Sequence, residues 1–532
     1  MRRKSSRLVV AATVALACLI SGCTAGVTSG SGSLAGPGGP TAGGSGAASG
    51  PATPAAPTPQ PAQFFDCSQY FNLSALPFPA GREQNLTFQC ALVPVSLDYS
   101  APAGSQIKIA LVRIHDKTNT GPHRDLLVNP GGPGGSGINY TVGLSAQISD
   151  TVLQHFDLVG FDPRGVGSSD PVRCESNHQE DVRNAASPDV STPAGFARAK
   201  QLARSFDNAC EAKYGAALPQ INTLNTARDM DQLRQALGDQ MLYYLGFSYG
   251  TELGSVYAHL FPHKVAAMVL DGAVDPLTGE IAADAQQLKG FEGAFDQFAS
   301  WCRDHAPCSK LGDPRAAVEA LAARASRDPI PTSTPGDSRR ATNSLVLTGV
   351  LGALYSKAKW PDLGNAVLSA QQGDAAGLLA LADQYNERYN GHYTNLADAN
   401  VTINCNDAKP GPSDARIRSI DTSWTRRFPI FGAWSVPSLF YCQQWQPDRT
   451  PPPLPTAEHT AHKVLVVGNL HDPATPYKGA QDLAKTMGNA ELLTWNGEGH
   501  TSYLEGSTCI DTYVNNYLVN GTLPPAETTC QR

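Results

Sequence analysis

The sequence predicts an α/β fold in which a mostly parallel sheet is covered by helices. Short apolar runs that resemble strands alternate with helical stretches in the first and last parts of the chain, and this alternation is typical of such a fold. About 470 residues follow a low-complexity N-terminal region, enough for a large core and more than one domain. The predicted strands are 108–114, 126–128, 156–161, 241–245, 267–270, 463–467 and 492–495.

One helix can be bounded from its pattern alone. Residues 226–238 carry Met230, Leu233 and Leu237 at helical spacing, so one face is apolar. Thr226 is the expected N-cap, and Gly238 is expected to end the helix.

The alternation stops between Asp275 and about residue 460, where helical patterns such as 315–325 and 365–385 dominate. This region is predicted to be a largely helical cap inserted between two strands of the sheet. The expected division of the folded part is therefore 63–274 as the first part of the core, 275–460 as the cap, and 461–532 as the C-terminal part of the core.

The most informative motif is Gly246-Phe247-Ser248-Tyr249-Gly250, between a predicted strand and a helix-like run. A strand, a Gly-x-Ser-x-Gly turn and a helix form the context of a nucleophile elbow, in which the serine side chain lies at the tip of a sharp turn. Glycines permit that turn. The alternative is an ordinary glycine-bounded turn with a solvated serine, because short motifs also arise by chance.

Two later residues have the order that a serine nucleophile requires. Asp472 follows the predicted strand 463–467, and His500 lies on a glycine-flanked loop after the next strand. The order Ser, Asp, His is that of α/β-hydrolases, in which the histidine moves the serine proton and the acid orients the imidazole. His471 is the competing histidine. His500 is preferred because it follows the acid by one strand.

A glycine-rich loop, Asn129-Pro130-Gly131-Gly132-Pro133-Gly134-Gly135-Ser136, follows the strand 126–128. An N–H group of this loop, with Gly132 as the candidate, is expected to form an oxyanion hole together with the N–H of Tyr249. A phosphate-binding loop is the other functional interpretation, but the motif lacks the lysine that would contact a phosphate. A plain turn is the structural alternative.

Together these motifs resemble the secreted or lipid-anchored tripeptidyl aminopeptidases of actinobacteria, α/β-hydrolases related to the proline iminopeptidases. The resemblance covers most of the chain beyond the N-terminal region. Phe247 departs from it, because a small or polar residue is expected there, and this concerns substrate preference more than catalysis. The segments that carry it are 128–137 (VNPGGPGGSG), 161–171 (FDPRGVGSSDP), 246–250, 271–276 (DGAVDP), 472–477 (DPATPY) and 499–502 (GHTS).

The resemblance implies a serine peptidase that releases short peptides, with tripeptides the first choice, from free N-termini through an acyl-enzyme. A carboxylate of the cap would bind the substrate's amine. The alternatives are a carboxylesterase or lipase with the same triad, and a surface binding lipoprotein built on an inactive hydrolase fold. Arg164 in the FDPRG turn could bind an anion, but in this fold we expect it to brace the loops.

The N-terminus indicates export. Four basic residues precede the apolar run 8–20, which is too short to span a bilayer and is typical of a signal peptide, expected over 1–22. Cys23 ends a lipobox-like Ile-Ser-Gly-Cys sequence and is the expected lipidation site; the alternative is an ordinary signal peptide. Residues 23–62 are predicted to form a disordered linker rich in Gly, Pro and Ser. The protein is thus expected in the cell envelope, on the outer face of the cytoplasmic membrane, or partly secreted.

Cysteine usage agrees with export. Ten of the 12 cysteines lie beyond Cys23, an even number that predicts five disulfides, with pairing between sequential neighbours as the simplest arrangement. A zinc site is the alternative, but no Cys-x-x-Cys pair supports one. No metal or other cofactor is expected. The ten are Cys67, Cys90, Cys174, Cys210, Cys302, Cys308, Cys405, Cys442, Cys509 and Cys530.

The charge of the chain argues against polyanionic partners. Its net charge is −7, and without the four basic residues of the predicted signal peptide 36 basic residues face 47 acidic ones, a net charge of −11. Such a chain is not expected to bind nucleic acid or to dock directly on anionic lipid. The expected partners are peptides with a free N-terminus, and the membrane through the lipid anchor only. The protein is expected to be a monomer.

Overall fold

The structure is a computed structural model that describes residues 60–119, 121, 124–457 and 459–531. The predicted signal peptide, Cys23 and residues 24–59 of the predicted linker lie outside the described residues. Within these ranges no helix is both long enough and apolar enough to cross a bilayer.

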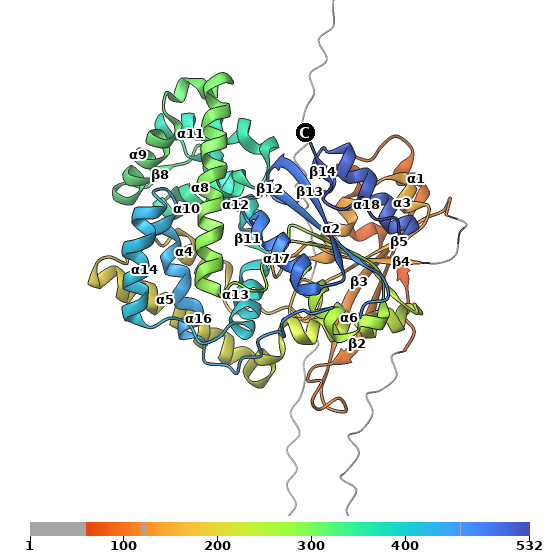
Figure 1. The fold of residues 1–532 in the computed structure, drawn as a ribbon. Helices are drawn as coiled ribbons and strands as arrows, with labels where there is room; N and C mark the ends of the chain where they lie inside the picture. The colour runs from red at the N-terminus through yellow and green to blue at the C-terminus, as the bar shows by residue number, and fades with distance from the viewer. Residues whose placement is uncertain (1–59, 120, 122–123, 458, 532) are drawn as a thin grey trace, which may run out of the picture.

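Ten strands form one sheet in the order β1-β2-β3-β5-β4-β6-β7-β12-β13-β14 (Figure 1). The pairs from β5 to β14 are parallel, and β1, β2 and β3 join by antiparallel pairing. All seven predicted strands are confirmed, so the α/β prediction holds. The strands are β1 (Phe65–Asp66), β2 (Leu86–Ser96), β3 (Gln106–Asp116), β4 (Asp125–Asn129), β5 (Asp157–Phe161), β6 (Leu242–Phe247), β7 (Val265–Asp271), β12 (Val464–His471), β13 (Ala490–Glu498) and β14 (Thr529–Cys530).

Strand β2 was missed because its buried residues alternate with more exposed ones and Pro94 interrupts the run. Alternation of this kind is typical of a strand with one buried face.

Helices cover both faces of the sheet. One face packs against α6 (Thr223–Leu237), α7 (Tyr249–Leu260) and α17 (Tyr477–Met487). The other packs against α2 (Gly137–Leu144), α3 (Asp150–Leu153) and α18 (Thr508–Asn520). The parallel strands are therefore buried on both sides, and their carboxyl ends meet at one edge of the sheet.

The predicted N-cap of α6 is wrong by one turn. The side chain of Asn222 caps the helix by accepting the N–H of Asn225, and Thr226 lies inside it, where its hydroxyl donates to the Asn222 carbonyl. Asn is as good an N-cap as Thr, so the cap residue could not be chosen from residue type alone. Gly238 ends the helix as predicted, with a φ of 88°.

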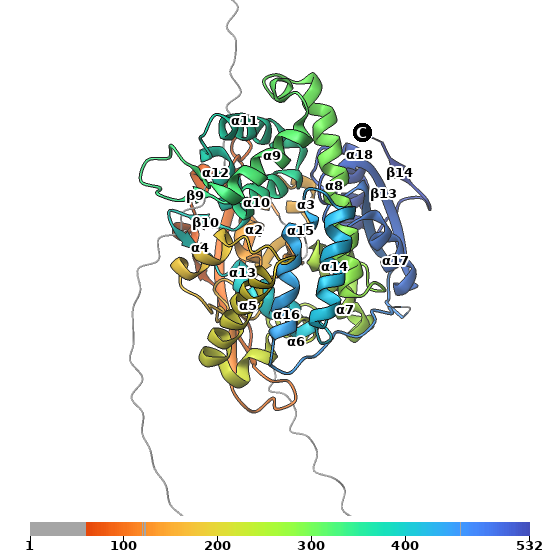
Figure 2. The ribbon, with the colours of Figure 1, turned by 90° about the vertical axis from the view of Figure 1, so that its left-hand side faces the viewer.

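The chain between β7 and β12 is mostly helical and forms a second body beside the sheet (Figures 1 and 2). We call these helices, α8 to α16, the helical insert. Its core also includes Phe196 and Ala203 from α5 (Pro193–Tyr214), which precedes the nucleophile motif. The insert comprises α8 (Glu280–Asp304), α9 (Pro314–Arg327), α10 (Asn343–Leu354), α11 (Trp360–Gln371), α12 (Ala376–Tyr385), α13 (Leu396–Asp407), α14 (Asp414–Arg427), α15 (Gly432–Ser435) and α16 (Leu439–Gln444).

The single helical pattern predicted over 365–385 is two helices, because α11 and α12 are separated at Gly373, whose φ of +97° is incompatible with a continuing helix. The boundaries 275 and 460 of the cap stay a prediction.

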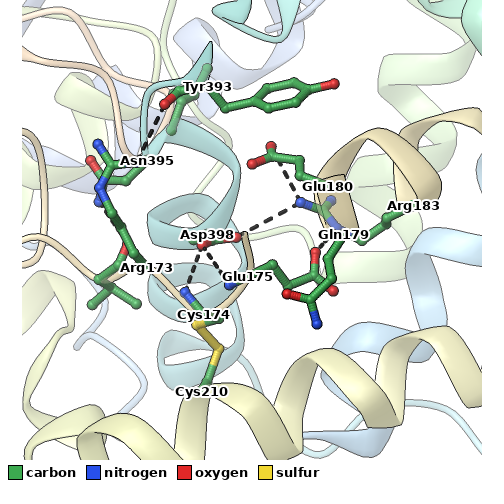
Figure 3. A network of polar contacts seen from close by, with 12 residues as sticks. Arg173, Cys174, Glu175, Gln179, Glu180, Arg183, Cys210, Tyr393, Asn395 and Asp398 are labelled. Atoms are coloured by element: carbon green, nitrogen blue, oxygen red, sulfur yellow. Dashed lines mark hydrogen bonds and ion pairs between the residues drawn. A yellow bond between two sulfur atoms is a disulfide. The ribbon is translucent and has the colours of Figure 1, made fainter. Parts of the chain in front are cut away.

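Helix α13 ties the insert to the core. Asp398 accepts hydrogen bonds from the N–H groups of Cys174, at 2.7 Å, and Glu175, at 3.4 Å. Arg183 of α4 (Asn177–Ala185) pairs with Glu175 at 2.7 Å and lies 3.8 Å from Asp398 (Figure 3). At the start of α13, the Asn395 side chain donates to the carbonyls of Gly165 and Val172.

Sequential cysteines pair, as predicted. All five disulfides join cysteines that are neighbours in the order of cysteines along the chain, and one of them, Cys405–Cys442, begins inside α13. The pairs are Cys67–Cys90, Cys174–Cys210, Cys302–Cys308, Cys405–Cys442 and Cys509–Cys530.

Arg164 braces loops, as expected, and is fully buried. Its guanidinium donates to both carboxylate oxygens of Asp229, at 2.7 and 2.6 Å, and to the carbonyls of Ser96, Leu97 and Gln220. Such a group is fully satisfied only while all these partners remain in place.

Replacing Arg164 by Ala is expected to lower the free energy of unfolding by at least about 3 kcal/mol, because Asp229 would keep a buried, unpaired charge. Urea unfolding with the disulfides intact measures the change. Arg340→Ala is the matched control: its pair with Asp328 is 2.8 Å long but exposed, so less than about 1 kcal/mol should be lost. Equal losses in the two variants would contradict the bracing role.

Candidate active site

Ser248 occupies a strained turn between β6 and α7. Its φ is 54° and its ψ is −126°, which is rare for a residue with a side chain. The turn can close only because residue 246 is a glycine: a Cβ atom at Gly246 would lie 2.5 Å from the Gly250 carbonyl oxygen. Gly250 in turn allows the end of β4 to approach, because a Cβ atom there would lie 2.8 Å from the Asn129 carbonyl oxygen. The N–H of Ser248 donates to the carbonyl of Asp271 at the end of β7, at 2.9 Å. This is the geometry expected of a nucleophile elbow.

Asp472 and His500 lie in direct contact. Nδ1 of His500 is 2.9 and 3.0 Å from the two carboxylate oxygens of Asp472, which is 4 % exposed. Asp472 follows β12 and His500 follows β13, and these two strands are adjacent and parallel. The Asp472 carboxylate also accepts the N–H groups of Ala474, Thr475 and Thr501, so its orientation is fixed.

Ser248 and His500 converge on the end of β7. The N–H of Ser248 bonds to Asp271, and the next residue, Gly272, is so close to the histidine that a Cβ atom there would lie 3.4 Å from His500 Cε1. No hydrogen bond joins the Ser248 hydroxyl to the His500 ring in the described ranges. Catalytic hydrogen bonds are often long without substrate and tighten when it binds.

The glycine-rich loop lies against the nucleophile turn. A Cβ atom at Gly131 would lie 2.9 Å from both Ser248 Cβ and the amide nitrogen of Tyr249. The N–H of Gly131 is used by the side chain of Asn129, at 2.9 Å. The N–H groups of Gly132 and Tyr249 have no partner among the described residues, and Tyr249 opens a helix, where N–H groups are free. Gly132 and Tyr249 therefore stay the candidates for an oxyanion hole.

Two other residues singled out in the sequence make their side-chain contacts outside the set of Ser248, Asp472 and His500. The ring of His471 is exposed and contacts Asn496 at 3.3 Å, not Asp472. Phe247 is 3 % exposed, with its ring centroid 5.4 Å from that of Tyr140. Phe247 is therefore buried against Tyr140.

Sequence reasoning missed three contacts of the histidine loop. The Thr475 hydroxyl lies 3.0 Å from Asp472 Oδ2 and 3.3 Å from His500 Nδ1. The carbonyl of Tyr355, at the end of α10, accepts the N–H of His500, and the two rings meet edge to face at 5.4 Å. The Asp271 carboxylate accepts the N–H groups of Ser502 and Tyr503. Thr475 and Asp271 stand within motifs used for the resemblance, but Tyr355 carried no signal in the sequence.

The charge state of His500 reflects two opposing effects. Burial by itself disfavours the imidazolium, but the adjacent Asp472 carboxylate stabilises it by charge and by hydrogen bonding, and the pKa of His500 is raised above 6.5. A raised pKa means that the neutral imidazole, the form that can accept a proton, predominates only at higher pH. Within the described residues no group of three His, Cys, Asp or Glu side chains could hold a metal ion.

The imidazole of His500 is therefore expected to titrate above 6.5. An Asp472→Asn variant should titrate lower, because the neighbouring negative charge is removed while the side-chain shape is kept. NMR titration of the imidazole Cε1–H signal measures both values, and loss of the signal in His500→Gln assigns it. An identical titration in the Asp472→Asn variant would contradict the electrostatic coupling.

Comparisons with known proteins agree with this geometry. A family model described as "alpha/beta hydrolase fold" matches residues 126–507. Serine protease Hip1 of Mycobacterium tuberculosis is 39% identical over 465 residues, covering 83% of this chain and 87% of that protein. Carboxylesterase B of the same species is 39% identical over 473 residues, covering 85% and 88%.

A third relative is the tripeptidyl aminopeptidase of Streptomyces coelicolor, 32% identical over 456 residues and covering 83% of each chain. The matched region includes β4, both faces of the sheet, the helical insert and the loop of His500. The chain belongs to the α/β-hydrolase family, in the group that contains these peptidase and esterase relatives.

Proposed function

We propose that this protein is an exported serine peptidase that releases short peptides from free N-termini, with tripeptides as the first choice. The observation that carries the proposal is the contact between His500 and Asp472 beside the strained turn of Ser248. Relatives named serine protease and tripeptidyl aminopeptidase support peptides as the substrate class.

In the proposed reaction Ser248 Oγ attacks the scissile carbonyl carbon while His500 accepts the hydroxyl proton. The carbonyl oxygen becomes an oxyanion that the N–H groups of Gly132 and Tyr249 stabilise. When the C–N bond breaks, His500 returns the proton to the leaving amine. Water then attacks the acyl-enzyme by the same route and regenerates the serine. Asp472 holds the imidazole and stabilises its charged form.

Recognition of a free N-terminus requires a carboxylate near the acyl side of the site, and Asp284 of α8 is our candidate. The face of α8 that carries Asp284 also carries Gln287, which donates to the Ala474 carbonyl at 2.9 Å. Gly290, on the same helix, packs so closely that a Cβ atom there would lie 2.4 Å from the Pro473 carbonyl oxygen. This face of α8 therefore lies against the loop of Asp472.

Reach and charge support Asp284. Asp284 lies six positions before Gly290, about 9 Å along the helix axis, and three extended peptide residues span at most about 11 Å. Burial, with a contribution from Glu280, raises the pKa of Asp284 to about 7, and it forms no hydrogen bond or ion pair with any described residue. A bound ammonium group would return this carboxyl group to its charged form.

A carboxylesterase is the second candidate, and the 39% identity to Carboxylesterase B is the observation that favours it. Acyl transfer from an ester uses the same nucleophile, histidine and oxyanion groups. The two functions differ in whether the substrate's free amine contributes to binding.

Ser248→Ala and His500→Ala are each expected to abolish nearly all turnover, because residues that act as one unit are strongly non-additive. Covalent labelling with a fluorophosphonate probe and hydrolysis of an acyl ester measure this. His471→Ala is the matched control and should retain wild-type rates. Loss of activity in His471→Ala with retention in His500→Ala would reverse the assignment.

Acetylating the N-terminus of a good tripeptide substrate should lower kcat/KM about a hundredfold or more, because the recognising carboxylate would be left unpaired. Asp284→Asn should lower turnover of the free tripeptide but not of the acetylated one. Asp296→Asn, at an exposed position of the same helix, is the control. Equal rates on free and acetylated peptides would favour the esterase.

A further inference from the structure

We propose that Asp271 is a positioning residue that sets Ser248 and His500 at their working separation, with its main chain holding the nucleophile turn and its side chain holding the histidine loop. This inference rests on the proposed function. It assigns a role in the reaction to a residue outside the Ser-His-Asp set.

The main chain of Asp271 holds the turn of Ser248 because of how β6 and β7 pair. Asp271 is the last residue of β7 and pairs with Phe247, the last residue of β6. Its carbonyl then accepts the N–H of Ser248 at 2.9 Å. The position of the turn along the sheet edge is thus fixed by the backbone of Asp271.

The side chain of Asp271 contacts the loop that carries His500. Oδ2 of Asp271 accepts the N–H of Ser502 at 3.0 Å and the N–H of Tyr503 at 2.8 Å. These residues follow His500 by two and three positions, in a loop where Thr501 has a φ of 68°. A backbone in that conformation needs external hydrogen bonds to persist, and Asp271 supplies two of them.

The surroundings of Asp271 are unusual for a purely structural acid. The side chain is 0 % exposed, and Oδ1 has no hydrogen-bond partner within the described part of the chain. Burial, opposed by the two N–H donors and reinforced by the charge of Asp472, raises the pKa of Asp271 to about 7. Among the described residues no ion pair joins a cation to this carboxyl group, and only the charge of His500 acts to lower its pKa beside the two N–H donors. Because only one oxygen of the Asp271 carboxylate accepts hydrogen bonds, the amide of an asparagine can replace it with its single carbonyl oxygen.

The test compares Asp271→Asn with Asp271→Ala in the full mature protein. The amide keeps an acceptor oxygen for Ser502 and Tyr503, so Asp271→Asn should retain most of kcat. Asp271→Ala removes both hydrogen bonds, and kcat for an acyl ester should fall about a hundredfold, the effect of displacing a reacting group by about 1 Å. KM should change little in either variant, because Asp271 is fully buried.

Two measurements keep the result interpretable. Circular dichroism and thermal unfolding show whether each variant is folded; if Asp271→Ala is not, Asp271→Ser, which also lacks the acceptor geometry, replaces it. Fluorophosphonate labelling of the wild type at Ser248 tests the proposed function separately. Absence of labelling in the wild type would overturn the function, and with it the premise of this inference.

With the wild type labelled, a folded Asp271→Ala variant with wild-type kcat would overturn the positioning role. So would an Asp271→Asn variant that loses as much kcat as Asp271→Ala, because the retained acceptor would then have no effect. A large loss of kcat in Asp271→Ala, together with a kcat near that of the wild type in Asp271→Asn, would support the positioning role.

Discussion

The left-handed backbone of Ser248 is the constraint on which the rest of the site depends. A residue with a side chain in that region costs about 1–3 kcal/mol and persists only if its surroundings determine it. Here the surroundings are the paired ends of β6 and β7, the close approach of Gly131, and the hydrogen bond to Asp271. Each of these contacts also positions another part of the site, so the turn of Ser248 and its neighbours are held by the same contacts.

Helix α13 connects these parts from the side of the insert. Asn400 donates to the Pro133 carbonyl in the glycine-rich loop, at 2.9 Å, and Asn395 holds the FDPRG turn at the other side. At its C-terminal end Asp407 accepts a 2.6 Å hydrogen bond from Thr223, whose hydroxyl also meets that of Tyr249. One helix of the insert therefore contacts the glycine-rich loop directly and is linked to the residue after Ser248 through Thr223 of α6.

The sequence predicted those features that follow from local pattern. The strands, the elbow at Ser248 and the pairing of neighbouring cysteines each depend on residues close together in the chain. The cap residue of α6 was wrong because Asn222 and Thr226 are both good caps and tertiary contacts decide between them. Tyr355 could not be predicted, because it accepts the N–H of His500 with its main-chain carbonyl. Every residue type has such a carbonyl, and the two residues lie far apart in the sequence. Asp271 begins the segment 271–276, which supports the resemblance. Its position next to the turn of Ser248 could be recognised only once the pairing of β6 with β7 was known.

The same geometry explains why relatives of equal similarity bear peptidase and esterase names. Attack by a serine, stabilisation of an oxyanion and hydrolysis of an acyl-enzyme are common to both reactions. An amide differs from an ester mainly in its leaving group, which must receive a proton as the bond breaks. Asp472 stabilises the imidazolium that forms when His500 takes the serine proton, and this imidazolium is the acid that protonates the leaving group. In the proposed function, discrimination depends on what lies beyond the reacting atoms, where the candidate carboxylate Asp284 would add binding energy only for a substrate with a free N-terminus.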